Sequence, residues 1–240
     1  NYPETLAWIH GTERFGSRLG LGRMGRLLHR MGDPHLKVPY IHVAGTNGKG
    51  STTTMIASAL TAGGFKTGKF ISPFILEFRE RMQIDGEMIP EETLAALATR
   101  LRPIAEEFKA AGDPPTEFEL VTVLGLTWFA EASCDIAVLE VGLGGRLDAT
   151  NIIPPPLVAV ITRIDYDHTA ILGDTLAAIA GEKCGILKRG GTVICYPDQE
   201  EEALAVIRRR AAEEGDPLIL PDRTVLSVLS ADLTGSRILY

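Results

Sequence analysis

The sequence predicts an α/β fold in which a mostly parallel sheet is flanked by helices. Short β-rich segments alternate along the chain with longer helical segments, and strands separated by helices form parallel sheets with right-handed crossovers. Residues 136–141 (I-A-V-L-E-V) are almost continuously apolar, which is typical of a strand covered on both faces. A glycine-rich loop at residues 45–51 lies between the first predicted strand and its helix, as in P-loop-like folds.

The predicted elements follow from composition and from end signals. The predicted strands are residues 40–44, 67–71, 136–141, 157–164, 191–196 and 218–220. The predicted helices are residues 51–62, 91–111, 117–132, 175–183 and 199–214. Gly63 and Gly64 close the first of these helices, and Pro90 suits the first turn of the second. Thr116 and Glu119 form a capping-box pattern at the start of the third.

Two stretches depart from this alternation. Residues 72–89 read as a long excursion between the second strand and the second helix. Residues 224–240 alternate in polarity like an antiparallel hairpin, so a small β region is expected to start at the C-terminus. We therefore expect an α/β domain at residues 1–222 and a terminal β segment at residues 223–240.

The composition excludes several classes of protein. The chain has 240 residues, of which 45% are apolar and 23% are charged, so a disordered chain is not expected. The net charge of −7 argues against nucleic acid as the main partner, because phosphate backbones select basic surfaces. The three cysteines lack C-x-x-C spacing, which favours a reducing compartment. No apolar run approaches the ~18 residues of a membrane span and no signal peptide is recognisable, so a cytoplasmic protein without membrane contact is expected.

The loop at residues 45–51 (G-T-N-G-K-G-S) suits polyphosphate binding. Its glycines let the backbone approach a ligand, and the N-terminus of the following helix adds partial positive charge. Lys49 would reach the terminal phosphates, and Ser51 would assist phosphate or Mg²⁺ binding. The strict P-loop pattern is not met, because Val43 replaces its first glycine and Gly50 separates the lysine from the serine. The alternative is an ordinary tight turn between strand and helix.

Polar residues follow several predicted strands. Ser72 follows the second strand, Glu140 lies near the end of the third, and His168 follows two acidic residues after the fourth. Because ligands of open parallel sheets gather beyond the carboxyl ends of the strands, we expect these groups to converge with Ser51 on one magnesium–nucleotide pocket. Each also has a plainer explanation, as a turn residue, a paired carboxylate or a surface histidine. Lys183, from the residues alone, reads as a solvated lysine at a helix end.

Together these segments resemble the folylpolyglutamate synthase/dihydrofolate synthase family, within the wider Mur ligase group. The resemblance starts at residues 19–21 (L-G-L) and rests on 45–51 (G-T-N-G-K-G-S), 72–73 (S-P), 80–82 (E-R-M), 116–122 (T-E-F-E-L-V-T), 140–151 (E-V-G-L-G-G-R-L-D-A-T-N), 167–168 (D-H), 172–173 (L-G) and 182–188 (E-K-C-G-I-L-K). The block at 140–151 is the most specific, because Mur ligases proper share the loop but not that block. The implied fold is the central domain of the Mur ligases.

The resemblance implies an ATP-dependent ligase of folate biosynthesis. Such enzymes activate a carboxylate of a folate or dihydropteroate substrate as an acyl phosphate. The amino group of glutamate then attacks the acyl phosphate and gives an amide, ADP and phosphate. ATP and Mg²⁺ are the implied cofactors, the other partners are small molecules, and a monomer is expected.

By motif position, the resemblance also implies site residues. ATP would be held by Asn47, Gly48, Lys49, Gly50 and Ser51. Mg²⁺ would be bound by Ser51, Ser72, Glu140, His168 and, if it is carbamylated, Lys183. The catalytic residues would be Lys49, His168 and Lys183. The pterin-bearing substrate would be held by Leu19, Gly20, Leu21, Thr116, Glu117, Phe118, Glu119, Leu147, Asp148 and Ala149.

Two residues depart from the family pattern. Phe74 stands where the family usually has His after Ser-Pro, and Gly22 stands where it often has Glu after Leu-Gly-Leu. Family members also carry a C-terminal domain that completes the ATP and glutamate sites, so this chain alone is expected to be inactive, with its terminal β segment leading towards that domain. Two alternatives stay open: a module that binds ATP and Mg²⁺ without turnover, and a Mur-type ligase that acts on a cell-wall precursor.

Overall fold

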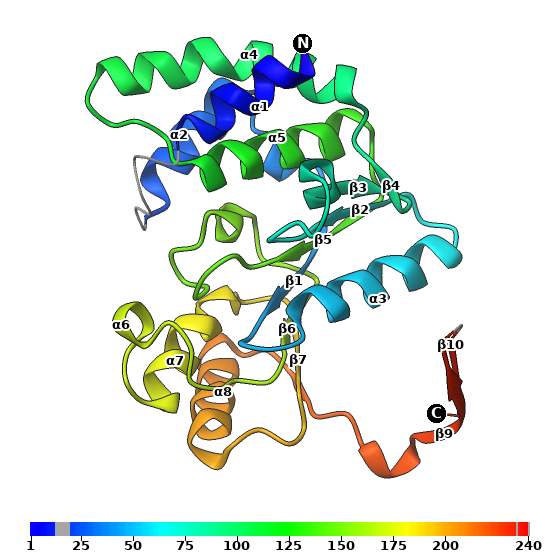
Figure 1. Ribbon diagram of the computed structural model, residues 1–240. Helices are drawn as coiled ribbons and strands as arrows, with labels where there is room; N and C mark the ends of the chain where they lie inside the picture. Colours follow the sequence, from blue (N-terminus) through cyan, green and yellow to red (C-terminus); the bar gives the residue numbers. More distant parts are fainter. Residues whose placement is uncertain (13–19, 234, 240) are drawn as a thin grey trace.

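The computed structural model describes residues 1–12, 20–233 and 235–239. In that part of the chain, the larger sheet has eight strands in the order β4-β3-β2-β5-β1-β6-β7-β8 (Figure 1). They are β1 (Tyr40–Ala44), β2 (Thr67–Phe70), β3 (Met82–Ile84), β4 (Glu87–Met88), β5 (Ile136–Glu140), β6 (Val158–Ile161), β7 (Thr192–Cys195) and β8 (Leu218–Ile219). Every predicted strand is present and lies within its predicted bounds.

The sheet is parallel except at one edge. β2, β5, β1, β6, β7 and β8 run parallel, with β1 between β5 and β6. β3 and β4 add antiparallel pairs at the β2 edge. Both lie in residues 72–89, where the sequence analysis predicted no strand. Asp85 and Gly86 join them with positive φ angles of 52° and 86°, which is the geometry of a tight Asp-Gly hairpin turn. The prediction of a mostly parallel sheet is confirmed.

The predicted helices are present with ends shifted by at most two residues. The helices are α1 (Tyr2–His10), α2 (Gly22–Arg30), α3 (Lys49–Ala62), α4 (Glu91–Ala110), α5 (Glu117–Glu131), α6 (Thr169–Leu172), α7 (Leu176–Lys183) and α8 (Glu201–Glu214). The short 3-10 helices are η2 (Pro34–Leu36), η3 (Phe78–Arg81), η4 (Ala149–Ile152), η5 (Cys184–Ile186) and η6 (Arg223–Val225). The sequence did not predict α1, α2 or α6. α2 lacks a side-chain N-cap and contains Gly25, so its local signals are weak.

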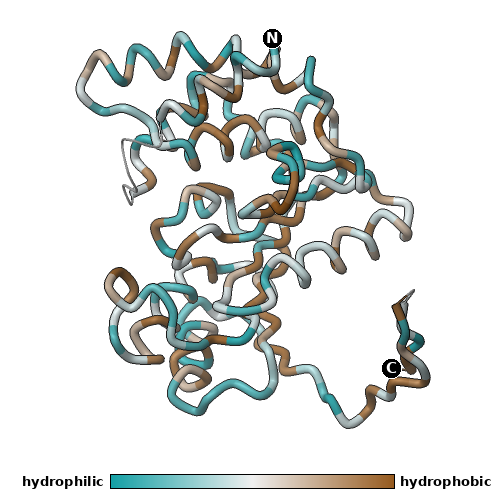
Figure 2. Tube along the Cα trace, viewed as in Figure 1, coloured by the Kyte–Doolittle hydropathy of each residue, from teal (hydrophilic) through white to brown (hydrophobic). Residues whose placement is uncertain are grey.

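Different helices cover the two faces of the sheet (Figure 1). Ile41 and Val43 of β1 pack in one hydrophobic cluster with Ala57 of α3. Tyr40 and Ala44 point to the opposite face, because side chains alternate along a strand. Tyr40 joins a cluster with α1, α2, α4 and α5, and Ala44 joins a second cluster with α7 and α8. Apolar residues, brown in Figure 2, therefore concentrate along the central strands, and β1 is buried over its whole length.

The C-terminal segment forms a separate sheet. β9 (Ser227–Asp232) and β10 (Gly235–Leu239) pair as an antiparallel hairpin that lies apart from the large sheet (Figure 1). The expected C-terminal hairpin is therefore confirmed. Among the helices of the residues given above, none has the length and apolar character needed to cross a membrane.

Candidate functional site

The glycine-rich loop joins the buried end of β1 to the N-terminus of α3. Gly45 has φ of 153°, and a Cβ there would lie 1.9 Å from Thr162 Oγ1, so only glycine fits. Gly48, with φ of 82°, is the N-cap residue of α3. The first N–H groups of α3 therefore face the loop together with the positive end of the helix dipole. Lys49 lies beside them and donates from Nζ to the Thr46 carbonyl at 3.1 Å, so the loop offers backbone donors and a cation to a phosphate.

Glu140 lies at the end of β5, directly beside this loop. A Cβ built on Gly50 would lie 3.3 Å from Glu140 Oε2, and the same oxygen accepts the Ser72 backbone N–H at 3.0 Å. Burial raises the pKa of the Glu140 carboxyl, while the Ser72 N–H and the Lys49 charge lower it. Ser51 lies in the first turn of α3, next to Gly50. The structure thus brings together the loop, Ser72 and Glu140, which are far apart in the sequence.

Lys183 contacts the start of the loop, and Asp167, which precedes His168, acts on Lys183 electrostatically. Lys183 is buried and donates from Nζ to the Gly45 carbonyl at 2.7 Å, so its interpretation from residues alone as a solvated lysine is wrong. Burial and the charge of Lys49 lower the pKa of Lys183 to about 8, and Asp167 opposes that shift. His168 is exposed, with φ of 48° and Nε2 3.6 Å from Asp167 Oδ2. Asp167, the residue before His168, is therefore within electrostatic reach of Lys183.

The donor groups at this edge fit a magnesium ion that binds together with a nucleotide. In the part of the chain that the structure describes, no three His, Cys, Asp or Glu side chains gather as a metal cluster. Mg²⁺ commonly binds one or two carboxylates, substrate phosphates and water, so a pre-formed protein cage is not required. Glu140 supplies a desolvated carboxylate next to the loop, and Ser51 and Ser72 supply hydroxyl groups. These residues therefore fit such an ion.

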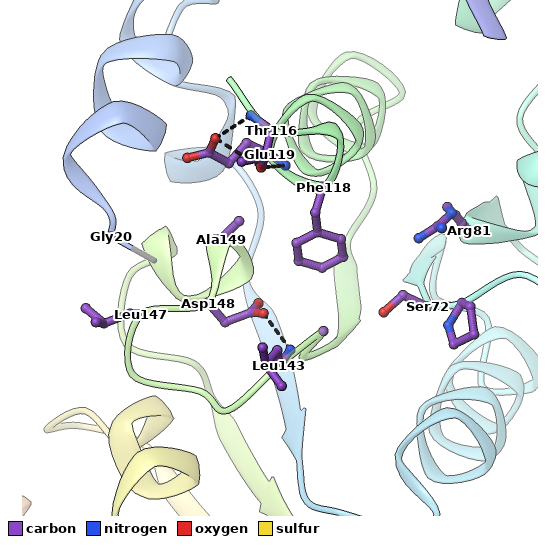
Figure 3. Close-up of a pocket in the computed structure, with 12 residues that line it drawn as sticks. Gly20, Ser72, Arg81, Thr116, Phe118, Glu119, Leu143, Leu147, Asp148 and Ala149 are labelled. Atoms are coloured by element: carbon purple, nitrogen blue, oxygen red, sulfur yellow. Dashed lines mark hydrogen bonds between the residues drawn. The ribbon is translucent and has the colours of Figure 1, made fainter. Parts of the chain in front are cut away.

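A cavity of about 280 Å³ adjoins this edge (Figure 3). It is lined by Gly20, Ser72, Pro73, Arg81, Thr116, Phe118, Glu119, Gly142, Leu143, Leu147, Asp148 and Ala149. Most residues expected to hold the substrate are among them. Leu21, next to Gly22 at the start of α2, does not line it, and Glu117 pairs instead with His10 at 3.2 Å. Leu19 lies outside the described residues.

Two buried carboxylates lie at this cavity. Asp148 accepts the Leu143 N–H at 2.9 Å, and burial raises its pKa. Glu119 Oε2 accepts the backbone N–H of Thr116 at 2.8 Å, as the capping box predicts, and Arg23 Nε at 2.8 Å. Its other oxygen, Oε1, is buried without a hydrogen-bond partner among the described residues. The cavity therefore offers acceptors for the N–H groups of a ligand.

The sequence motif E-R-M contains a cavity residue to which no role was assigned. Arg81 lines the cavity, its Nε is buried without a partner among the residues described, and burial lowers its pKa. Its guanidinium lies 5.2 Å from the ring centre of Phe74 and 5.7 Å from that of Phe78. Phe74, the departure from the family pattern, therefore helps to hold this cation. Phe118 packs against Gly142, where a Cβ would lie 2.6 Å from the ring.

Comparisons with known proteins show which proteins this chain is similar to. The family model described as "Mur ligase middle domain" matches residues 43–215. A dihydrofolate synthase/folylpolyglutamate synthase of Bacillus subtilis is 44% identical over 218 residues, which are 90% of this chain and 50% of that protein. A folylpolyglutamate synthase of Lacticaseibacillus casei is 42% identical over 240 residues, which are 98% of this chain and 55% of that protein. The chain thus spans about half the length of these curated relatives.

Solved structures show the same fold. A folylpolyglutamate synthase of Thermotoga maritima superposes with a TM-score of 0.89 at 35% identity, over 99% of this chain and 54% of the other. A complex of FPGS with AMPPCP and folate also gives a TM-score of 0.89, at 40% identity, over 99% of this chain and 58% of the other.

Proposed function

Because this chain belongs to the Mur ligase family, we propose that it is the nucleotide-binding part of an ATP-dependent ligase that joins glutamate to a folate or dihydropteroate carboxylate. The relatives named above carry those activities in their names, as the sequence resemblance implied. The observation that carries the proposal is the position of Ser72. Its N–H binds Glu140 beside the phosphate loop, and the same residue lines the 280 Å³ cavity. A nucleotide phosphate and a substrate in the cavity would therefore meet at one place.

In this proposal the phosphates of ATP lie on the loop. They would be held by Asn47, Gly48, Lys49, Gly50 and Ser51. A carboxylate oxygen of the substrate attacks the γ-phosphorus, and ADP leaves, which gives an acyl phosphate. The amino nitrogen of glutamate then attacks the acyl carbon, phosphate leaves, and the nitrogen loses a proton. Lys49 neutralises charge on the transferred phosphoryl group, and Mg²⁺ when bound supplies further charge neutralisation.

The cavity suits a flat heterocycle that carries a carboxylate. The ring of Phe118 offers an aromatic surface. Asp148 and the unpartnered Oε1 of Glu119 offer acceptors for ring N–H and amino groups. Arg81 offers a cation, and Ser72 marks the side of the cavity that meets the phosphate loop. Gly20, Thr116, Leu147 and Ala149 would form the remaining wall.

Lys183 and His168 complete the proposed site. Only a neutral amine adds CO₂, and the buried Lys183 has its pKa lowered to about 8, which raises the neutral fraction at physiological pH. Its carbamate would place a second carboxylate beside Gly45, and His168 would act as a further metal ligand and catalytic residue. High-resolution electron density at Lys183 Nζ tests the carbamate directly.

An assay of ADP release by the complete gene product tests the proposed function. ADP should form only when ATP, Mg²⁺, glutamate and either dihydropteroate or a reduced folate are all present. Lys49→Met should abolish this turnover, whereas Lys37→Met, at an exposed lysine, is the matched control. Nucleotide binding without turnover would instead indicate a non-catalytic module. ADP release with a muramyl peptide precursor would indicate a Mur-type ligase.

We also propose two segments for this chain and a monomeric state for the complete protein. Residues 1–222 would be the α/β ligase domain, and residues 223–240 would lead towards a C-terminal domain. We propose a cytoplasmic monomer that acts on small molecules and not on nucleic acid. Light scattering of the complete protein with and without nucleotide tests the monomer, and a dimer in both states would contradict it.

A further inference from the structure

β1 carries a histidine that the proposed chemistry does not use. His42 is completely buried at the middle of this strand. It points to the same face as Tyr40 and Ala44, because side chains alternate along a strand. Those two neighbours belong to different hydrophobic clusters, so His42 lies at the boundary between them. A polar ring in such a place needs a partner, since burial of an unpaired polar group is costly.

The partner of His42 lies in the cavity loop, 108 residues along the chain. His42 Nε2 is 2.8 Å from Thr150 Oγ1. Thr150 Oγ1 in turn donates to Asp148 Oδ1 at 2.5 Å, and the Thr150 backbone N–H donates to the same oxygen at 2.9 Å. The other oxygen of Asp148 accepts the Leu143 N–H at 2.9 Å. A continuous hydrogen-bond chain therefore runs from His42 through Thr150 to the carboxylate at the cavity.

The direction of this chain follows from proton counting. A threonine hydroxyl has one hydrogen, and here it goes to Asp148, so the imidazole must donate from Nε2–H to Thr150 Oγ1. Burial raises the pKa of Asp148, and the hydrogen bonds from Thr150 and from the Leu143 backbone lower it, so these donors favour the carboxylate as the acceptor. His42 Nδ1 is then the bare nitrogen, which agrees with its lack of a hydrogen-bond partner within the described residues. The reverse direction would bury an unpaired N–H.

A half-buried lysine, Lys188, holds the same loop, and burial of the ring together with the charge of this lysine keeps His42 neutral. Lys188 Nζ donates to the carbonyls of Asn151 and Ile153 at 2.7 and 2.6 Å, directly after Thr150. Burial and the charge of Lys188 lower the pKa of His42 to about 3. The ring is therefore a fixed neutral donor at physiological pH.

We propose that His42 is a positioning residue, which through Thr150 holds the Asp148 carboxylate in the orientation that the substrate cavity requires. β1 also leads directly into the phosphate loop at Gly45, so one strand positions both the loop and the cavity carboxylate. The ligand in this role is a pterin-type heterocycle, and in that respect the role rests on the proposed function.

The first test determines which ring nitrogen of His42 is protonated, and it needs no ligand. In ¹⁵N NMR of this chain, protonated and bare ring nitrogens resonate far apart. Wild type should show His42 with protonated Nε2 and bare Nδ1. The chemical shift of the Nε2–H proton should change in Thr150→Val, which removes the acceptor. It should stay the same in Thr150→Ser, which keeps the hydroxyl. A protonated Nδ1 in wild type, or a Thr150→Val spectrum identical to wild type, would overturn the proposal.

The second test measures dissociation constants of the complete protein for pteroate and for Mg²⁺·AMPPCP. Thr150→Val should weaken pteroate binding about tenfold, the effect of one lost buried hydrogen bond, and leave AMPPCP binding within about twofold. Thr150→Ser should bind pteroate like wild type. His42→Gln keeps a side-chain N–H donor and should bind better than His42→Leu, which has none at similar size.

The outcomes of the second test separate positioning from general damage. Equal pteroate binding by the donor-bearing and donor-free variants would overturn the proposal. So would a parallel loss of pteroate and AMPPCP binding, which is the sign of a purely structural role. If wild type does not bind pteroate at all, the proposed function fails, and the imidazole spectrum alone then decides whether the hydrogen-bond chain exists.

Discussion

Substitution of Gly185 by alanine should push the cavity loop away from the segment that follows α7. A Cβ at Gly185 would lie 2.3 Å from both Cα and Cβ of Arg146 and 2.7 Å from its backbone N. The backbone at Gly185 does not have a positive φ, so the effect is steric and not conformational. The side-chain amide of Asn151 also joins these two segments, through the carbonyls of Arg146 and Gly185 at 3.1 and 3.0 Å. Any separation of the segments strains these bonds as well.

The size of the effect follows from the cost of overpacking. Forcing extra atoms into a well-packed region costs about 1–3 kcal/mol. For a domain of this size each kcal/mol lowers the melting temperature by roughly 2–4 °C, so Gly185→Ala should melt roughly 2–12 °C below wild type. Thermal unfolding followed by circular dichroism measures this shift.

Gly181 provides a matched control four residues earlier. It lies inside α7, and a Cβ there would meet no atom within 4 Å. Gly181→Ala should therefore raise stability by about 0.5–1 kcal/mol, because alanine is the better helix former. A melting temperature of Gly185→Ala equal to or above that of wild type would refute the packing argument. An equal loss in Gly181→Ala would show that the loss is not specific to the contact with Arg146.

Three further predictions concern charge. Glu140→Gln should reduce the Mg²⁺-dependent gain in AMPPCP affinity about tenfold, measured by calorimetry with and without Mg²⁺, and an unchanged gain would contradict the metal assignment. Arg81→Met should weaken binding of pteroate about tenfold, but not that of neutral hydroxymethylpterin, since only pteroate carries a carboxylate. Burial lowers the folded-state pKa of Lys188 to about 8, below its unfolded value. Its protonation therefore costs stability at low pH, and the cost disappears as pH rises above 8. The stability of wild type relative to Lys188→Met should increase by about 1 kcal/mol between pH 8 and 10 in urea unfolding, and a decrease would contradict the sign.

Local signals were sufficient for the elements that carry the nucleotide loop. β1 and α3 were predicted because apolar residues, glycines and a helix end follow each other within one short stretch. Residues 72–89 were not predicted to contain strands. The Asp-Gly pair at 85–86 is nevertheless a typical hairpin signal, and it forms the turn between β3 and β4. α2 is different, because local signals for a helix are weak there. Its apolar residues Met24, Leu27 and Leu28 are buried in a cluster with residues of α4 and α5, so this helix depends on tertiary packing.

The side chains of the site were harder to predict than the fold. Lys183 is read as solvated from its sequence neighbours, because they do not reveal that the carbonyl of Gly45, 138 residues earlier, accepts a hydrogen bond from its Nζ. The surroundings of Arg81 and His42 are equally hidden in the sequence, because the contacts of each residue come from other segments of the chain. Arg81 lies against Phe74, and His42 is hydrogen-bonded to Thr150. Motif resemblance assigned a role to Lys183, which stays a prediction, and it gave no role to Arg81 or to His42. Whether the assigned residues act as proposed stays a prediction for the assays above.

The C-terminal hairpin has a practical consequence for handling the protein. It is a sheet of two strands with exposed Val228, Leu229 and Ile238, and such ribbons are marginally stable in water. Their outer edges can add strands from neighbouring copies in concentrated solution. A recombinant product that ends at residue 222 should therefore remain monodisperse during concentration for crystallisation, where the 240-residue chain would tend to self-associate.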